Sequence, residues 1–240
     1  MEQEQDQDQR ARTTSVSKPQ KIQAITFDVG GTLIEPWPSV GHVYAEVAAA
    51  HGVGGLDPES LNRQFAAVWR AKEGFDYSRS GWADIVAKTF HGSGQSEIKF
   101  FEALYERFAH REAWRIFDDV LPALESLSEQ GIRLAVISNW DERLRPLLGE
   151  LRLDRYFEFL AISSEIGFHK PSPVIFHEVI RKLSLAPQAV LHVGDSPMED
   201  FQGSIQAGLH AALLNRKRSS TASPPESELT SLTHLAAMLQ

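Results

Sequence analysis

Two patterns of hydrophobic and polar residues follow one another along the chain. Residues 22–27 (IQAITF) form a short apolar run with β-branched members, which predicts a buried strand that ends at Asp28. From about residue 41 to residue 115, apolar residues such as Val43 and Val47 recur at helical spacing, and no run rich in β-branched residues interrupts them. This second part is expected to be a helical insertion.

Beyond residue 115, short apolar runs alternate with amphipathic helical segments. Strands are expected at residues 133–139, 157–163, 189–195 and 210–215, and helices at residues 120–130, 143–151, 173–183 and 198–207. Strands that are joined by helical crossovers form a parallel sheet covered on both faces. We therefore expect an α/β fold, with a doubly wound parallel Rossmann-like core and an inserted α-helical cap.

The change of pattern also sets the expected domain boundaries. Residues 1–20 are rich in Gln, Asp and Glu and are expected to be a disordered leader. Residues 21–38 and 116–215 should form the core, and residues 39–115 the cap. Residues 216–240 begin with RKRSSTASPPESE, which indicates a flexible linker before a short terminal helix.

The composition of the 240 residues argues against several classes of protein. There are 0 cysteines, so the chain has no disulfide, no thiolate metal ligand and no cysteine nucleophile. The formal net charge of -8 argues against nucleic acid as a partner, and no apolar run reaches the roughly 18 residues that span a bilayer. The N-terminus lacks the apolar segment of a secretory signal. We expect a cytoplasmic protein whose oligomeric state is open.

Polar residues stand where the predicted core strands end. Asp28, Ser138 with Asn139, and Asp195 close three of these strands, and Lys170 follows another. Each has an ordinary explanation when taken alone, such as a helix cap or a turn. However, ligands of open parallel sheets bind at the carboxyl ends of the strands, near the switch in strand order. Together these residues predict one site at that edge.

Four segments resemble the four motifs of the haloacid dehalogenase superfamily, and they occur in the family's order. FDVGGTL resembles the first motif, VISN the second, HKPSP the third and VGDSPMED the fourth, from Phe27 to Asp200. The helical insertion follows the first strand, which is a usual cap position in this family. The resemblance implies a hydrolase of the phosphatase-like branch with a helical cap, acting on a small phosphorylated substrate.

The resemblance also implies a role for each matching residue. Asp28 would be the nucleophile and would form an aspartyl-phosphate. Asp28, Asp195 and the backbone carbonyl of Gly30 would hold Mg²⁺, which screens the repulsion between carboxylate and phosphate. Ser138 would donate a hydrogen bond to a phosphoryl oxygen, and the backbone N–H of Asn139 is a possible second donor.

Three further residues are implied to support this chemistry. Lys170 would be catalytic and phosphate-binding, because its positive charge serves both the nucleophile and the phosphate. Asp200 would form a hydrogen bond to Lys170 or to a metal-bound water without contacting the substrate. Thr32 would help to bind the phosphate and would orient the turn, and Gly31 would let the backbone approach closely.

One departure from the family pattern concerns turnover. The phosphatases of this family carry a second aspartate two residues after the nucleophile, which protonates the leaving group and then activates water. This chain has Gly30 there. General acid–base catalysis contributes about 10²–10⁴ in rate, or about 3–5 kcal/mol of barrier. We therefore expect reduced turnover, and we expect Gly30→Asp to raise it.

Several explanations of Gly30 are open. Glu35 or His42 could supply the proton, or the substrate could have a good leaving group, such as an acyl phosphate. The chain could also be a weak or silent enzyme that binds phosphorylated ligands or a partner. The 2-haloacid dehalogenases also lack that aspartate but need no metal. Phosphonoacetaldehyde hydrolases keep magnesium and use a Schiff-base lysine from the cap, for which Lys72 and Lys88 are the candidates.

The insertion is expected to act as a lid. Trp69, Phe75, Tyr77 and Trp82 give it an aromatic surface that could exclude water and shape specificity. For Trp69 we favour a place in the hydrophobic core of the insertion itself. Trp140, directly after Ser138 and Asn139, either lines the site or covers the sheet edge.

Overall fold

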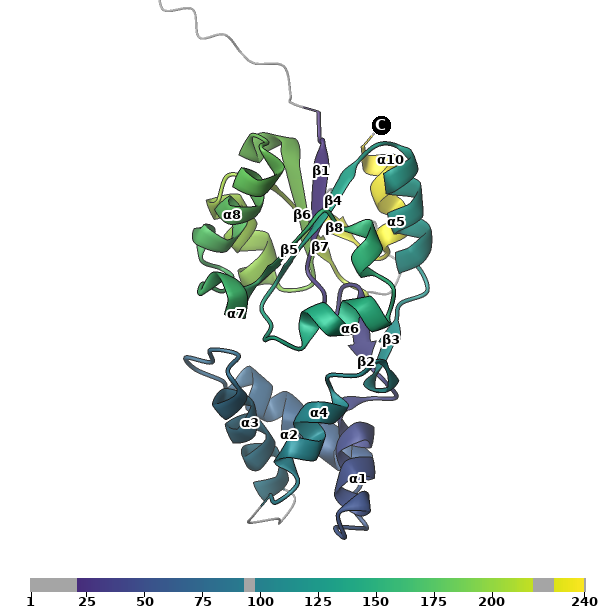
Figure 1. Ribbon diagram of the computed structural model, residues 1–240, viewed down its shortest axis with the longest axis vertical. Coiled ribbons are helices and arrows are strands. Elements are labelled where there is room, and N and C mark those ends of the chain that lie inside the picture. Colours follow the sequence, from purple (N-terminus) through teal and green to yellow (C-terminus); the bar gives the residue numbers. More distant parts are fainter. Residues whose placement is uncertain (1–20, 93–97, 218–226, 240) are drawn as a thin grey trace, which may run out of the picture.

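The structure is a computed structural model, and it describes residues 21–92, 98–217 and 227–239. The expected leader and most of the expected linker lie outside the described residues. The described chain forms an α/β core with a group of helices, the cap, beneath it (Figure 1). Within these residues, no helix is both long and apolar enough to cross a membrane.

The core contains a six-stranded sheet in which every neighbouring pair is parallel, in the order β5-β4-β1-β6-β7-β8. Its strands are β1 (Ala24–Phe27), β4 (Arg133–Ser138), β5 (Phe159–Ile162), β6 (Val190–Gly194), β7 (His210–Leu214) and β8 (Glu228–Leu229). All residues of β1 and β6 are buried, which explains why the central strands are continuous apolar runs in the sequence.

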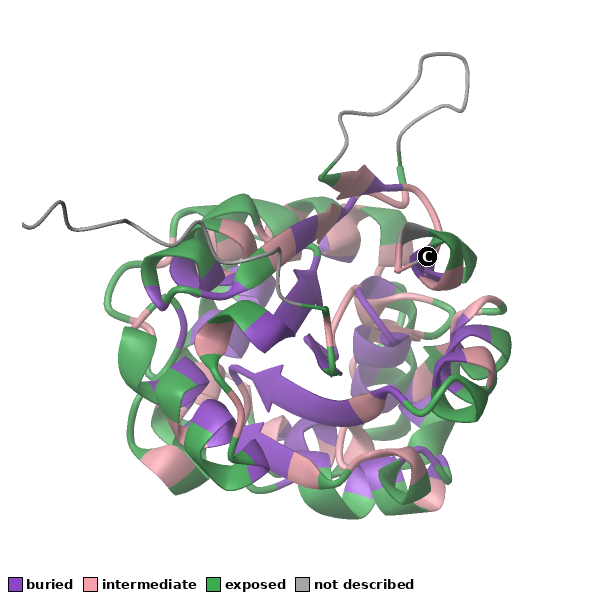
Figure 2. Ribbon diagram, turned by 90° about the horizontal axis from the view of Figure 1, so that it is seen from above, coloured by how far each residue is buried: buried purple, intermediate pink, exposed green. Residues whose placement is uncertain are grey.

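Helices cover both faces of this sheet (Figure 1). One face carries α5 (Val120–Glu129), α6 (Leu144–Glu150) and α10 (Leu235–Met238), and the other carries α8 (Pro173–Leu183) and α9 (Gly203–Gln206), with α7 (Ser163–Ile166) after β5. Figure 2 shows the buried strands in the middle and the exposed sides of the helices outside. The doubly wound Rossmann-like fold expected from the sequence is confirmed.

In its described residues, the cap contains four helices: α1 (Val40–Ala50), α2 (Pro58–Arg70), α3 (Arg79–His91) and α4 (Phe101–Arg107). Polar side chains start three of them, because the hydroxyl of Ser39, the carboxylate of Asp57 and the hydroxyl of Ser78 each accept a hydrogen bond from a backbone N–H of the first turn. The cap has its own hydrophobic core, which includes Tyr44 and Phe90.

Two strands between core and cap were not expected. β2 (Ile34–Pro36) and β3 (Trp114–Ile116) pair antiparallel, so both chain connections to the cap run through one short ribbon. The sequence analysis placed residues 114 and 115 in the helical insertion, and three-residue strands are too short for their periodicity to be recognised. Short 3₁₀ turns cover Arg111–Ala113, Asp154–Tyr156, Pro187–Ala189 and Leu232–His234.

Two further expectations need correction. The terminal segment is more than a helix after a linker, because β8 pairs with β7 and the side chains of Leu232 and Leu235 are buried in the core. The single helix expected at residues 198–207 is a π-helix (Pro197–Gln202) followed by α9. A π-helix often marks a functional site, and this one begins three residues after β6.

Candidate active site

The predicted site residues meet at the carboxyl ends of the central strands. Phe27 lies opposite Val136 on one side and Val193 on the other, so the residues that follow these three positions emerge at one edge. The hydroxyl of Ser138 donates to Oδ1 of Asp28 at 3.1 Å. The strand register therefore brings Asp28 and Ser138 together as the sequence analysis expected.

Lys170 contacts Asp28 from inside the protein. Its side chain is buried, and Nζ donates to Asp28 Oδ1 at 2.7 Å, to Asp200 Oδ1 at 2.5 Å and to the carbonyl of Ile137 at 3.0 Å. Burial alone would lower the pKa of Lys170, but the two carboxylates raise it above its ordinary value. All three N–H donors are directed to protein oxygens. In this geometry Lys170 contacts the nucleophile and has no N–H left for a phosphate.

Asn139 holds the backbone of Lys170 in place. Its Oδ1 accepts from the Lys170 backbone N–H at 2.6 Å, and its Nδ2 donates to the Lys170 carbonyl at 3.0 Å and to Glu199 Oε2 at 3.1 Å. The Asn139 side chain is thus occupied with positioning. A role for its backbone N–H in phosphate binding stays a prediction.

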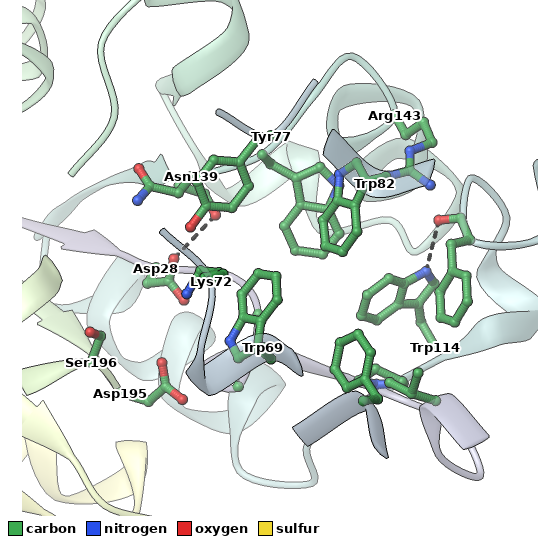
Figure 3. A pocket seen from close by; sticks show the side chains of 18 of the residues that line it. Asp28, Trp69, Lys72, Tyr77, Trp82, Trp114, Asn139, Arg143, Asp195 and Ser196 are labelled. Atoms are coloured by element: carbon green, nitrogen blue, oxygen red, sulfur yellow. Dashed lines mark hydrogen bonds between the residues drawn. The ribbon is translucent and has the colours of Figure 1, made fainter. Parts of the chain in front are cut away.

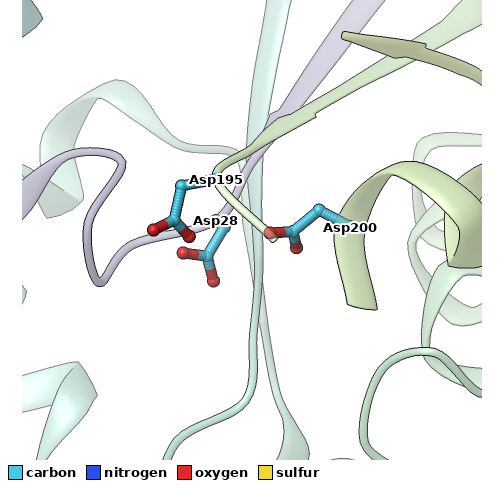
Figure 4. A group of neighbouring side chains, drawn as sticks. All are labelled: Asp28, Asp195 and Asp200. Carbon is cyan, nitrogen blue, oxygen red and sulfur yellow. The ribbon is translucent and has the colours of Figure 1, made fainter. Parts of the chain in front are cut away.

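Three carboxylates converge on this edge (Figure 4). One oxygen from each of Asp28, Asp195 and Asp200 lies within 4.8 Å of the others. Burial raises the pKa of Asp28, although Lys170 opposes the shift. Burial and then the charge of Asp28 raise the pKa of Asp195 to about 7. These shifts indicate negative charge that Lys170 does not fully compensate.

The donor set fits a divalent cation that prefers oxygen ligands, such as Mg²⁺. Asp200 is engaged on both oxygens, because Oδ1 accepts from Lys170 and Oδ2 accepts from the backbone N–H of Ser196 at 2.9 Å. Asp28 and Asp195 are the carboxylates left for a metal, and Asp195 is exposed toward the cavity. Asp200 lies where the sequence analysis expected it, behind Lys170.

A buried histidine extends this arrangement and was missed in the sequence. His192, in the middle of β6, lies 2.9 Å from Thr26 Oγ1 through Nδ1 and 3.1 Å from Asp200 Oδ1 through Nε2. Burial lowers the pKa of His192, which favours the neutral ring with Nε2–H donating to Asp200. The only signal in the sequence is a polar residue inside an apolar strand. Side-chain hydrogen bonds thus connect Thr26, through His192, Asp200 and Lys170, to Asp28.

The turn after Asp28 depends on its glycines. Gly31 has φ +81°, and an added Cβ would lie 2.4 Å from Asp195 Oδ2, so a side chain there is excluded. A Cβ at Gly30 would lie 3.2 Å from Cζ3 of Trp140. The space above Gly30 is thus occupied by an indole ring.

Thr32 does not reach the phosphate site. Its backbone N–H donates to the Val29 carbonyl at 3.3 Å, which turns the chain back on itself. The Thr32 side chain is fully buried, its hydroxyl has no partner, and it is not among the cavity-lining residues. The expected phosphate contact is therefore wrong for this geometry, whereas the role in shaping the turn is retained.

A cavity of about 570 Å³ separates the cap from the core and opens onto Asp28. Figure 3 shows carboxylates and polar groups at one end and aromatic rings along the remainder. Its lining includes Asp28, Asn139, Asp195, Ser196 and Glu199 at the polar end, and Trp69, Tyr77, Trp82, Trp114 and Trp140 elsewhere. Trp69 was expected in the cap core, but it is half-buried and faces this cavity.

One arginine of the core contacts the cap at the edge of the cavity. The guanidinium of Arg143 lies 3.6 Å from the ring centroid of Tyr105 in α4 and donates to the Tyr105 carbonyl at 2.9 Å. Asp141 orients the guanidinium through an ion pair of 2.6 Å, and the Tyr105 hydroxyl donates to Glu142 at 2.9 Å. The sequence analysis did not single out these residues.

The two proposed substitutes for the missing aspartate lie away from the site. Glu35 forms an ion pair with Arg115 across the β2–β3 ribbon, and His42 is exposed and bonded to Ser39 at 2.8 Å. Neither lines the cavity. The group from the cap that does reach the polar end is Tyr77, whose ring points toward Asn139 and Asp28 (Figure 3). Its φ of 61° is a strained value for a tyrosine.

The structure separates the two cap lysines. Lys72 lines the cavity, with Nζ 4.0 Å from the ring centroid of Trp69. Lys88 is exposed and pairs with Asp84 at 2.6 Å, one turn earlier on α3. Only Lys72 is placed to meet a substrate.

Comparison with known proteins agrees with this architecture. The haloacid dehalogenase-like hydrolase family matches residues 22–208. Human haloacid dehalogenase-like hydrolase domain-containing protein 3 is 35% identical over 237 residues, which cover 91% of this chain and 94% of that protein. The HAD-hydrolase YfnB of Bacillus subtilis, solved bound to magnesium, has a TM-score of 0.75 at 19% identity and covers 92% of this chain and 99% of its own.

A structure with a different chemistry shares the fold as well. The 2-haloacid dehalogenase of Pseudomonas syringae has a TM-score of 0.63 at 25% identity, covering 91% of this chain and 98% of its own. Because one fold carries both phosphate and carbon–halogen chemistry, the fold alone does not choose between them. The choice depends on the residues at the site.

Proposed function

This chain belongs to the haloacid dehalogenase-like hydrolases, and we propose that it is a Mg²⁺-dependent hydrolase of small phosphorylated compounds. The observation that carries the proposal is the position of Asp28 between Lys170, at 2.7 Å, and the carboxylate of Asp195. A metal-free dehalogenase has no need of the second carboxylate. The absence of cysteine suits a reducing cytoplasm, where we place the protein.

In the proposed reaction Asp28 attacks phosphorus and forms an aspartyl-phosphate, which water then hydrolyses. Bound Mg²⁺, held by Asp28, Asp195 and the carbonyl of Gly30, would screen the repulsion between the anionic nucleophile and the phosphate. Ser138 turns its hydroxyl from Asp28 toward a phosphoryl oxygen. The backbone N–H of Asn139 donates to a second oxygen.

Lys170 and its partners keep the nucleophile ionised and in place. Its ammonium group, fixed by Asp200, stabilises the charged form of Asp28 against the effect of burial. His192 fixes Asp200 in turn. Because each contact is buried, the Asp28 carboxylate is oriented before a substrate arrives, which is the main electrostatic contribution in phosphoryl transfer.

Gly30 leaves no carboxylic acid two residues after the nucleophile. The leaving group must depart without that donor, and the water that attacks the aspartyl-phosphate lacks that base. We expect the second step to be slow and the phospho-enzyme to accumulate. A burst of product equal to the enzyme concentration, followed by slow turnover, is the kinetic sign of this.

The test is a steady-state assay over phosphomonoesters and acetyl phosphate, with and without Mg²⁺, on the wild type and Asp28→Asn. Asp84→Asn, at an exposed site on α3, is the matched control. We expect activity that requires Mg²⁺ and Asp28, and intact mass spectrometry should show one phosphate per chain. A complete lack of activity on all these substrates would favour a silent phosphate-binding protein instead.

The position of Lys72 supports a second candidate function, the cleavage of a carbon–phosphorus bond through a Schiff base. It is the cap lysine that lines the cavity. Borohydride reduction in the presence of phosphonoacetaldehyde would trap a covalent adduct on Lys72, and Lys72→Arg would prevent it. Lys88→Arg is the control, because Lys88 lies on the outer side of the cap.

A further inference from the structure

We propose that the substrate is an aryl phosphate, in which a phenolic oxygen carries the phosphoryl group and the ring lies against the aromatic wall of the cap. This inference rests on the proposed function and specifies its leaving group. Two independent observations carry it. One is the chemistry of the cavity wall, and the other is the space around Gly30.

The cavity wall offers flat apolar surface next to the nucleophile. Trp69 and Trp82 lie parallel, with ring centroids 5.6 Å apart and an interplanar angle of 11°. Tyr77 lies on the side of these two rings that faces Asp28, and its ring centroid is 6.4 Å from that of Trp69 (Figure 3). Trp69 and Trp82 are only half-buried and lie outside the hydrophobic core of the cap. Both rings line the cavity, and Trp69 also stacks on Phe65 of the cap, with ring centroids 5.8 Å apart.

The cavity is also large enough for such a substrate. Its volume of about 570 Å³ is within the roughly 300–1,000 Å³ of small-molecule sites. The carboxylates of Asp28 and Asp195 lie at one end of it, and the Arg143 guanidinium at the aromatic end is paired with Asp141. A substrate with one charged end and one apolar ring matches this distribution (Figure 3). A short aliphatic phosphate would leave the rings without a contact.

The second observation is that the cavity lacks a suitably placed acid. Trp140 occupies the space above Gly30, where an added Cβ would already lie 3.2 Å from the indole. Asp200 is bonded to Lys170, and Glu199 accepts from Asn139. The other carboxylates of the described cavity lining are Asp28, the nucleophile, and Asp195, the proposed metal ligand, so each lining carboxylate already has a partner or a role.

A phenolic leaving group removes the need for that acid. Asp28 Oδ forms a bond to phosphorus while the bond from phosphorus to the aryl oxygen breaks, and the phenolate departs with the electron pair. A phenol has a pKa of about 10, whereas an aliphatic alcohol has a pKa near the value of about 15.7 for water. Phenolate therefore leaves unprotonated and takes its proton from water afterwards. Water then cleaves the aspartyl-phosphate to inorganic phosphate and regenerates Asp28.

The first experiment compares phenyl, benzyl and cyclohexyl phosphate on the full chain with Mg²⁺, with acetyl phosphate as reference. Phenyl and benzyl phosphate share a ring, but only phenyl phosphate releases a phenolate. We expect kcat/KM for phenyl phosphate to exceed that for cyclohexyl phosphate by about 10²-fold or more, the contribution of a missing general acid. Benzyl phosphate should have a dissociation constant similar to that of phenyl phosphate but a much lower rate of phosphoryl transfer to Asp28 in single-turnover experiments.

The second experiment tests the wall. Trp82→Leu should raise the ratio of KM for phenyl phosphate to KM for acetyl phosphate by about 2- to 12-fold, the equivalent of 0.5–1.5 kcal/mol for an aromatic pair. The control is Trp37→Leu, because Trp37 is exposed, lies over Arg115 and does not line the cavity. Circular dichroism and thermal unfolding confirm that both variants fold.

The third experiment restores the acid. In the double variant Gly30→Asp, Trp140→Ala, the indole no longer blocks the new carboxylate, and cyclohexyl phosphate should gain more rate than phenyl phosphate. Trp140→Ala alone is the control. Equal kcat/KM values for phenyl and cyclohexyl phosphate in the wild type, with acetyl phosphate hydrolysed, would overturn the aryl inference and leave the phosphatase standing. Failure to hydrolyse acetyl phosphate as well would remove the proposed function itself.

Discussion

The two walls of the cavity are built from different interactions. On the core side Lys170, Asp200 and His192 are buried and joined by hydrogen bonds of 2.5 and 3.1 Å. On the cap side Trp69 and Trp82 are half-buried and meet through ring contacts. Directed hydrogen bonds between buried charges allow one arrangement, whereas ring packing allows several. We therefore propose that the core side sets the chemistry and that the cap side selects the substrate.

The largest effect in this comparison is expected for Lys170→Met. The variant leaves Asp28 and Asp200 as buried carboxylates without their cation, which costs about 3–5 kcal/mol in the free energy of unfolding. Activity should fall by about 10²–10³-fold, because the nucleophile loses its electrostatic partner. Urea unfolding and the acetyl phosphate assay measure the two effects.

Lys72→Met is the matched variant on the cap side. Its ammonium group contacts the Trp69 ring. In the described residues it forms no hydrogen bond or ion pair with a buried carboxylate, so the free energy of unfolding should change little. A loss of stability as large as that of Lys170→Met would contradict the division between the two walls.

Asp195→Asn is expected to have the next largest effect, and its sign depends on metal. Without Mg²⁺ the variant should be more stable than the wild type at pH 8. The pKa of Asp195 is raised to about 7, so the wild-type fold loses stability as pH rises from about 4, the unfolded pKa, to about 7, and the loss is complete at pH 8. The midpoint of thermal unfolding should rise by a few degrees at pH 8, roughly what about 1 kcal/mol produces in a chain of this size.

The same variant should lose the stabilisation that Mg²⁺ gives to the wild type. A differential scanning fluorimetry titration at pH 8 shows this as a midpoint that no longer rises with Mg²⁺ concentration. An unchanged response to Mg²⁺ would mean that Asp195 is not a ligand.

A smaller effect is expected for His192→Gln, which acts through Asp200. Activity should fall by about 10- to 100-fold, the usual range for groups that orient a site from behind. The pKa of His192 is lowered by burial, so the wild-type fold loses stability as pH falls below about 6.5, where the unfolded histidine takes up a proton. The variant should lose less stability than the wild type between pH 7 and pH 5. Equal pH dependence would contradict this assignment.

The smallest effect is expected for Tyr77→Phe, on the cap side. If the phenolic hydroxyl donates one hydrogen bond to the leaving oxygen, kcat/KM should fall by about 5-fold, the equivalent of about 1 kcal/mol. The fall should be greater for benzyl phosphate than for phenyl phosphate, because the alkoxide needs the donor more. An equal loss with both substrates would indicate that Tyr77 only packs.

The sequence alone placed most of the core side of the site, although it did not reveal His192. Asp28, Ser138 and Asp195 each follow an apolar run that can only be a central strand, and parallel strands deliver their carboxyl ends to one edge. The resemblance to four family motifs added the order of their roles, including the place of Asp200 behind Lys170. The positions of these residues could be predicted because the hydrophobic periodicity locates the strands, and the order of the strands along the chain determines which residues reach that edge.

The tertiary structure alone decided the rest. The contact of Trp140 with Gly30, the burial of Thr32 and the bond between His192 and Asp200 join side chains by their direction in space, and no local pattern encodes that direction. The same holds for Trp69, whose helical spacing suits the cap core and the cavity equally well. Hydrophobic periodicity identifies the face of a helix that avoids water, but only packing against the core determines what that face meets.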